Sequence, residues 1–236
     1  MLWQSLVESV YFFKNNFFAI AAIILPIAIP IELFDALYEN FVITDNSTYV
    51  EQSIPFIVML LASPLYAIAV IFYIASQIKG EAISVKTAWQ FGIKYWQPYL
   101  ALTILLLIIF MLGFMLLFIP GVILVVRYAF AEFELLFNNK RPIDAMKSSW
   151  AASGQCFWKL LGGFFIIASA LYIPLILIQV SVDDFETTYP ILDSMLNILY
   201  SVPQVLLTIF SYRVYVQIVG DKDVMNTSEV TDSEKY

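Results

Sequence analysis

The feature that most constrains this chain is an apolar run from Tyr99 to Ile119 that contains no charge and ends at Pro120-Gly121. About 20 predominantly apolar residues are enough for a helix to cross the hydrocarbon of a bilayer. A Pro-Gly pair is typical of a tight turn, so the apolar residues that follow predict a second helix returning beside the first. The sequence therefore predicts a membrane hairpin that leads into a charged segment, 138–158.

Similar runs recur along the chain, in which 61% of the 236 residues are hydrophobic and only 13% are charged. We therefore predict an all-α fold, a polytopic membrane helical bundle of six transmembrane helices in one domain covering residues 1–220. The predicted spans are 17–37, 54–78, 98–119, 121–137, 157–180 and 190–219. A polar tail, 221–236, follows the last span, and its composition favours disorder.

Two amphipathic stretches, 83–94 and 142–154, join spans and are predicted to lie on the membrane surface as cytoplasmic elbow helices. Each places apolar side chains on one helical face and charged or polar side chains on another, the pattern of an interfacial helix. Tryptophan rings favour the membrane-water interface. Four tryptophans in or beside the elbows are predicted interface anchors: Trp89, Trp96, Trp150 and Trp158.

The order span, elbow, span occurs twice, first from the second predicted span to the third and then from the fourth to the fifth. Both copies would share one orientation, which differs from the inverted repeats of many transporters. A chance likeness between two hairpins with tryptophan-flanked loops is the alternative interpretation.

Orientation follows from the basic residues, because lysine and arginine near span ends are enriched on the cytoplasmic side. In the six-span arrangement nine of them share one side: Lys14, Lys79, Lys86, Lys94, Lys140, Arg141, Lys147, Lys159 and Lys222. The connecting segments 35–51 and 183–189 carry acidic charges alone. We therefore predict that both termini and both elbows are cytoplasmic.

Arg127 is the charge predicted to lie deepest, because it follows the Pro120-Gly121 turn by six residues, roughly 9 Å along a helix. An arginine inside hydrocarbon costs about 2.5 to 3.5 kcal/mol and requires a partner. Glu134 is about two turns further along the same helix, so we expect a partner from a neighbouring span. The acidic candidates are Glu32, Asp35 and Asp193. A structural ion pair or snorkelling is favoured over contact with a ligand or ion.

The last predicted span carries a polar stripe, whose members recur every three or four residues: Ser194, Asn197, Ser201, Gln204, Thr208 and Ser211. Such a stripe either packs against a neighbouring helix, the favoured interpretation, or lines a wet cavity. Pro203 lies within the stripe and predicts a local kink. Arg213, near the cytoplasmic end, is expected to extend its guanidinium to the interface.

Catalytic and metal chemistry have little support in the sequence. The chain has one cysteine, Cys156, and no histidine, so it lacks the usual zinc, haem and His-based catalytic arrangements. We predict a protein that is not an enzyme and that uses no cofactor and no metal. The expected partners are the lipid bilayer and, as an open alternative, other inner-membrane proteins or a second copy of the chain, but not nucleic acid.

Several short motifs resemble the YciC family of uncharacterised bacterial inner-membrane proteins and its relatives. They are Ile119-Pro120-Gly121 with Arg127, then Ala145 and Ser148-Ser149, and finally Phe157-Trp158-Lys159. The resemblance implies a multi-pass protein of the bacterial inner (plasma) membrane, with no established biochemical activity.

Two functional hypotheses remain open at this point. The leading hypothesis is a non-enzymatic structural or partner-binding envelope protein. The alternative is a small-molecule transporter or channel that uses the polar stripe and Arg127. The candidate intramembrane polar contacts are Arg127, Glu134, Asn197, Ser201, Gln204 and Arg213.

Overall fold

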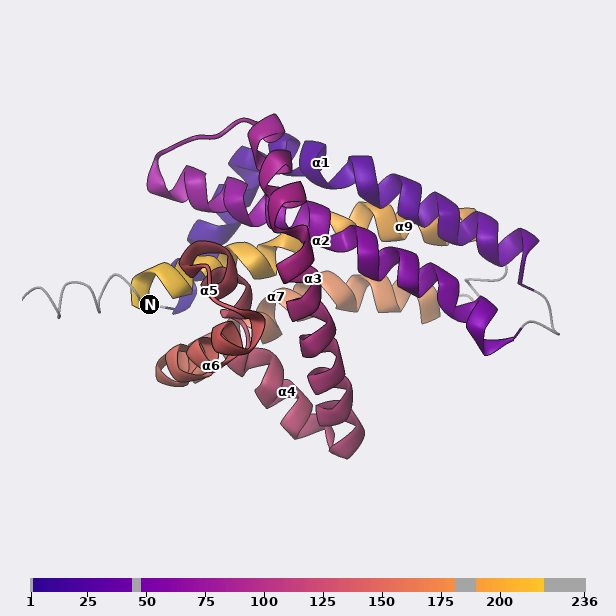
Figure 1. Cartoon of the computed structure of the whole chain (residues 1–236). Coiled ribbons are helices and arrows are strands. Elements are labelled where there is room, and N and C mark those ends of the chain that lie inside the picture. Colours follow the sequence, from indigo (N-terminus) through magenta and orange to yellow (C-terminus); the bar gives the residue numbers. More distant parts are fainter. Residues whose placement is uncertain (1, 44–47, 181–189, 219–236) are drawn as a thin grey trace, which may run out of the picture.

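A computed structural model describes residues 2–43, 48–180 and 190–218, with no side-chain detail for 190–193. The described residues form helices connected by turns (Figure 1). The long helices are α1 (Leu2–Phe41), α2 (Tyr49–Lys79), α3 (Val85–Leu116) and α7 (Phe157–Val180). The shorter elements are α4 (Phe118–Arg127), α5 (Ala131–Asn138), α6 (Pro142–Ser153), the 3-10 turn η1 (Gly154–Cys156) and α9 (Pro190–Ser201).

The chain ends, within the described part, in a further helical segment of residues 205–218, which we call the C-terminal helix. A turn at 202–204 separates it from α9, at the position where Pro203 predicts a kink. The predicted tail, 221–236, and the predicted acidic segment, 183–189, lie outside the described residues.

Five helical stretches of the described chain are long and apolar enough to cross a membrane. They are Leu2–Phe41, Tyr49–Lys79, Val85–Leu116, Pro142–Val180 and Ser194–Ile218. The prediction of an all-helical chain with several potential membrane spans is therefore confirmed.

The boundaries of the helices differ from the prediction in several places. The turn predicted at Pro120-Gly121 lies instead at Leu117, and both of those residues are inside α4. The first predicted span, 17–37, lies within one continuous helix, α1, because Pro26 and Pro30 are accommodated inside it. The first elbow, 83–94, is continuous with the span that follows, so that α3 contains both. The fourth predicted span, 121–137, is divided between α4 and α5 by a turn at 128–130.

The second predicted elbow, 142–154, forms the helix α6, which belongs with α7 to one helical stretch, Pro142–Val180. Pro142 occupies the first turn of α6, where its missing N–H has no helical partner to lose. Gly154 then begins η1, which leads directly into α7. The two predicted span-elbow-span copies therefore differ in their connections, because the first elbow has no break after it.

α1 packs against α2, α7 and α9. Aliphatic side chains of α1 and α2 fill much of the contact, with Ile20, Ile24, Ile68 and Ile74 fully buried. α3 packs across α2 at Gly92, where an added Cβ would lie 2.5 Å from the Leu65 carbonyl oxygen. The missing side chain of Gly92 therefore lets the two backbones meet.

α3 and α4 form a tight hairpin that projects from the side of the bundle (Figure 1). Gly113 of α3 faces Gly121 of α4, and a Cβ on Gly113 would lie 3.2 Å from the Gly121 Cα. A Cβ on Gly121 would in turn lie 2.4 Å from the ring of Phe114. Close contact of the two legs thus depends on glycine at both positions.

Candidate functional site

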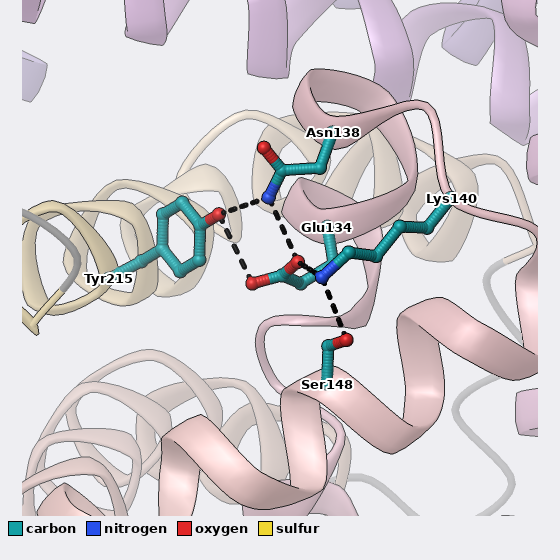
Figure 2. Close-up of polar contacts among 5 residues, drawn as sticks. All are labelled: Glu134, Asn138, Lys140, Ser148 and Tyr215. Carbon is teal, nitrogen blue, oxygen red and sulfur yellow. Dashed lines mark hydrogen bonds and ion pairs between the residues drawn. The ribbon is translucent and has the colours of Figure 1, made fainter.

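The most connected polar group in the described chain is the carboxylate of Glu134, which lies where α5, α6 and the C-terminal helix meet. Glu134 is 5% exposed. Figure 2 shows Glu134 surrounded by four polar side chains from these elements and from the turn between α5 and α6. We call this cluster the Glu134 junction; its members are Glu134, Asn138, Lys140, Ser148 and Tyr215.

Both oxygens of the Glu134 carboxylate accept hydrogen bonds. Oε2 lies 2.7 Å from the Lys140 Nζ and 2.9 Å from the Asn138 Nδ2, both of which donate to it. Oε1 accepts from the Tyr215 hydroxyl at 3.3 Å. The Tyr215 oxygen accepts in turn from Asn138 at 3.2 Å. A buried carboxylate is tolerated when it is paired and hydrogen-bonded in this way.

The local sequence explains how Lys140 reaches Glu134. Asn139, which follows α5, has a φ of 48°, a left-handed conformation that asparagine tolerates better than most residues. This turn reverses the chain, and Pro142 then begins α6. The ammonium of Lys140 is therefore directed back toward α5 and also donates to Ser148 of α6 at 2.8 Å.

The contact between Lys140 and Ser148 superficially resembles a Ser-Lys catalytic pair, in which a neutral lysine removes the proton from the serine. In this junction the Lys140 ammonium is paired with the Glu134 carboxylate at 2.7 Å. A protonated lysine has no lone pair with which to accept a proton. The junction is therefore suited to joining helices and not to activating Ser148.

Aromatic side chains enclose the junction on the side of the C-terminal helix. The Tyr215 ring lies 5.4 Å from the rings of both Phe130 and Phe133, measured between centroids. The Phe133 ring also meets Tyr212 edge to face at 5.3 Å. These contacts exclude water from the Tyr215 side of Glu134, which strengthens its hydrogen bonds.

Arg127 has no hydrogen bond or ion pair with Glu134 in the described chain and lies instead against the end of α6 and the start of α7. Its Nη1 donates to the Trp150 carbonyl oxygen at 3.3 Å. The guanidinium carbon lies 5.0 Å from the centre of the Trp150 ring and 5.7 Å from that of Phe157. The structure thus offers Arg127 a carbonyl and two rings where we expected a carboxylate. Cation-π contact of this kind partly offsets the loss of hydration.

Gly154 provides the space that the arginine occupies. A Cβ on Gly154 would lie 2.5 Å from the Arg127 Nη1. The glycine that marks the end of the second elbow in the sequence therefore also admits the guanidinium. This second role has no signal in the local sequence.

Two serines of α6 satisfy the backbone at the break between α4 and α5. The Arg127 carbonyl accepts from the Ser149 hydroxyl at 2.8 Å and from the Ser153 hydroxyl at 2.9 Å. The Ser149 oxygen also accepts from the Phe130 N–H at 3.0 Å. Both serines are fully buried. The Arg127 carbonyl at the end of α4 and the Phe130 N–H at the start of α5 are thus paired with serine side chains, as buried helix ends require.

The polar stripe of the last predicted span is not gathered into one site. The Ser201 hydroxyl donates to the Ile198 carbonyl, and that of Ser211 donates to the Leu207 carbonyl, both within their own helical segments. Gln204 is exposed, and Asn197 is partly buried. None of these contacts involves Arg127.

Arg213 forms an ion pair with α1 and so joins the two ends of the described chain. Its Nη1 lies 2.7 Å from Glu8 Oε2, and its guanidinium carbon lies 5.7 Å from the centre of the Phe12 ring. The side chain of Arg213 is 21% exposed. This contact goes beyond the expected extension toward the interface.

The four predicted interface anchors have different surroundings. Trp158 is 80% exposed and Trp150 is 41% exposed, while Trp89 and Trp96 are partly buried. The Trp96 indole N–H donates to the Leu61 carbonyl of α2 at 2.8 Å. Trp96 therefore helps to join α2 and α3 in addition to any role at an interface.

A second feature, not predicted from the sequence, is a largely apolar groove of about 340 Å³ whose lining includes Glu132. Thr208 and Ser211 of the polar stripe also line the groove. The Tyr99 hydroxyl is a hydrogen-bonding partner of Glu132. Glu132 and Glu134 are two positions apart, so they point to different faces of α5, and this spacing is the signal that distinguishes their roles.

Comparisons of the chain with protein-family models, curated proteins and solved structures find no match.

Proposed function

We propose that this chain is a non-enzymatic protein of the bacterial inner membrane that acts by helix packing and partner binding. In this proposal both termini and the second elbow, α6, face the cytoplasm, in keeping with the distribution of lysine and arginine. α6 lies along the inner surface with Trp150 and Ile143 exposed toward lipid. The resemblance to the YciC family supports the same location.

The observation that carries this proposal is the complete pairing of Glu134 within the protein. Its two oxygens accept from Lys140, Asn138 and Tyr215, which belong to three different parts of the fold. A carboxylate engaged in this way is poorly placed to bind a substrate or an ion. Arg127 is paired only in part, because its Nη1 and ring contacts are made within the chain while its buried Nε has no hydrogen-bond partner in the described chain.

Transport or binding of a small molecule is the second candidate function, and the Glu132 groove favours it. This groove combines a carboxylate with the hydroxyl-bearing residues Thr208 and Ser211 on an otherwise largely apolar lining. An acidic side chain in a membrane-embedded cavity is a recognised feature of ion and proton pathways. Gln204 and Arg127 lie outside the lining, so this candidate differs from the one based on the stripe and Arg127.

Two variants separate these candidates. Glu132→Gln removes the charge from the groove, and the double variant Glu134→Gln with Lys140→Met removes the ion pair from the junction while leaving no lone charge. Each would be produced in a strain lacking the gene, with protein level in the membrane and growth under detergent and osmotic stress as measurements. The proposal predicts that the Glu132→Gln variant accumulates at the normal protein level and restores the growth of the strain that lacks the gene. Loss of growth by Glu132→Gln at normal level would support transport instead.

The matched control is Glu81→Gln, which also removes one negative charge but at an exposed position after α2. It should behave as the unmodified protein. The double variant at the junction should reduce protein level and growth together, because it weakens the contacts between helices. Reduced growth with an unchanged protein level would contradict a packing role for the junction.

A further inference from the structure

The turn between α3 and α4 is the most exposed apolar part of the described chain. Its side chains from Met115 to Ile119 are 69% to 87% exposed, and all five are large and hydrophobic. The chain has no polar side chain from Ile104 to Val126, a stretch that includes both legs of the hairpin near the turn. A surface of this kind is unfavourable in water and marks contact with lipid or protein.

The length of α4 sets the distance between this turn and the other end of α4, which contacts α6. α4 has 10 residues and ends at Arg127, which contacts Trp150 in α6. At 1.5 Å per residue α4 is about 15 Å long, roughly half of the ~30 Å hydrocarbon thickness of a bilayer. If α6 lies at the cytoplasmic interface, as the basic residues in and before it indicate, the turn lies near the middle of the membrane.

The arrangement of the bundle agrees with this depth. In Figure 1 the α3–α4 turn projects from the side of the molecule, whereas the end of α1 and the start of α2 lie together at one end of the bundle. α3 runs across α2, with Gly92 at the crossing. A helix that lies obliquely can be long without reaching the opposite surface.

The backbone of the turn pairs some of its own polar groups, and every group left unpaired is costly in hydrocarbon. Leu117 is the single residue between the two helices, and its N–H donates to the Gly113 carbonyl at 3.2 Å. The Gly121 N–H donates to the Leu117 carbonyl at 3.4 Å. Pro120 has no N–H to satisfy. At the turn, the N–H groups of Phe118 and Ile119 and the carbonyls of Phe114, Met115 and Leu116 are thus left without a backbone partner in the described chain.

We infer that the α3–α4 hairpin enters the membrane from the cytoplasmic side and returns to it, with its turn in contact with lipid acyl chains. The third and fourth predicted spans then do not cross the bilayer. The number of complete crossings falls from six to four, made by α1, α2, α7 and the α9 and C-terminal segment. Both termini stay cytoplasmic, because a hairpin that enters and leaves on one side does not change the orientation of the helices that follow.

This inference is tested with nitroxide spin labels on single cysteines, introduced after Cys156→Ala and reconstituted in liposomes. The labelled positions are Leu117 at the turn, Val50 in the first turn of α2, and Phe165 on the exposed surface of α7. Oxygen concentrates in hydrocarbon and a nickel chelate stays in water, so their collision rates with the label distinguish lipid from solvent. Size-exclusion chromatography before reconstitution confirms that each variant is folded.

We expect the label at Leu117 to behave like the one at Phe165, with frequent oxygen collisions and infrequent nickel collisions, and the label at Val50 to show the reverse. Frequent nickel collisions at Leu117 would place the turn in water and overturn the inference. Infrequent collisions with both reagents would show that protein, such as a second copy of the chain, covers the turn. That result would overturn it as well.

Discussion

The α1–α2 and α3–α4 connections each join two consecutive helices. Polar side chains cap the helix after the first connection, whereas the second connection is apolar. At the start of α2 the Thr48 hydroxyl accepts from the Glu51 N–H, and the Glu51 carboxylate accepts from the Thr48 N–H, which together form a capping box. At the start of α4 the residue before the helix is Leu117, and no side chain caps the helix. Polar caps suit a turn in water, whereas the apolar side chains around Leu117 suit hydrocarbon.

The other end of α4 sharpens this comparison, because there the chain does use side-chain hydroxyls. Ser149 and Ser153 pair with the Arg127 carbonyl, and Ser149 also accepts from the Phe130 N–H. One short helix thus has an apolar end and a polar end. The difference agrees with our proposal that the apolar end lies in lipid and that the polar end lies at the interface beside α6.

The largest expected effect comes from placing a charge in each connection. Leu117→Asp should destabilise the protein by about 3 kcal/mol, the cost of an aspartate deep in a membrane on insertion scales. Val50→Asp should change stability little, because Val50 is 72% exposed beside the polar connection. Unfolding in bicelles, followed by denaturant titration, measures both values. Equal effects at the two positions would remove the distinction between the turns.

Removing the hydroxyl cap at the polar end of α4 should have the next largest effect. Ser149→Ala leaves the Phe130 N–H without its acceptor and deprives the Arg127 carbonyl of one of two donors. A buried group left unsatisfied costs about 1 to 3 kcal/mol. The same unfolding titration should therefore show a loss of that size.

The matched control for this change is Ser53→Ala. The Ser53 hydroxyl donates to the Val50 carbonyl in an exposed part of α2, where water can replace it. Its loss should be within about 0.5 kcal/mol of neutral, as for most surface substitutions. A Ser149→Ala variant as stable as Ser53→Ala would show that the break between α4 and α5 does not depend on α6.

Adding a methyl group between the legs of the hairpin tests whether their close contact holds the turn together. Gly113→Ala would place a Cβ 2.4 Å from the Leu124 Cδ1 and 3.2 Å from the Gly121 Cα. Overpacking costs about 1 to 3 kcal/mol, and we expect the lower part of that range because the end of a leucine side chain can move. Gly162→Ala is the control, since its nearest neighbour would be 3.4 Å away. If both variants unfold at the same denaturant concentration, close contact at Gly113 is not required.

The smallest effect is expected at the polar connection itself. Thr48→Ala removes the side-chain acceptor of the capping box and should cost about 1 kcal/mol. Because the site is exposed, water compensates for part of the loss. Amide hydrogen exchange at the start of α2 should become faster while exchange in α4 stays unchanged. Faster exchange in both regions would show that the two connections are coupled.

The sequence predicts the helical class of this fold well, because long uncharged runs have few alternatives in a polypeptide chain. It also predicts a turn between α3 and α4, although the break lies at Leu117 and not at Pro120-Gly121, and it predicts a helix that begins at Pro142. It does not predict the break after Arg127, because the residues 128–130 are compatible with a helix by composition. That break is stabilised by Ser149 and Ser153, some 20 residues further along the chain.

The candidate site was predictable only in part. The apolar surroundings of Arg127 and Glu134 identify both residues as unusual, but their partners depend on tertiary structure. Lys140 reaches Glu134 only because Asn139 reverses the chain, and Tyr215 comes from a helix 81 residues away. Glu132 acquires its groove from the packing of several helices, so no local pattern indicates it.

Our central claim is that the α3–α4 turn lies in hydrocarbon and not in water. Labelling of cysteines in intact cells tests this claim most directly. In a Cys156→Ala background, Leu117→Cys and Val50→Cys would each be exposed to a membrane-impermeant maleimide added outside the cells. Leu117 is 69% exposed, so the surrounding protein does not shield it. We predict that Val50→Cys reacts readily and that Leu117→Cys reacts more slowly by about two orders of magnitude, because the reactive thiolate does not form in hydrocarbon. Equal rates at the two positions would contradict the account.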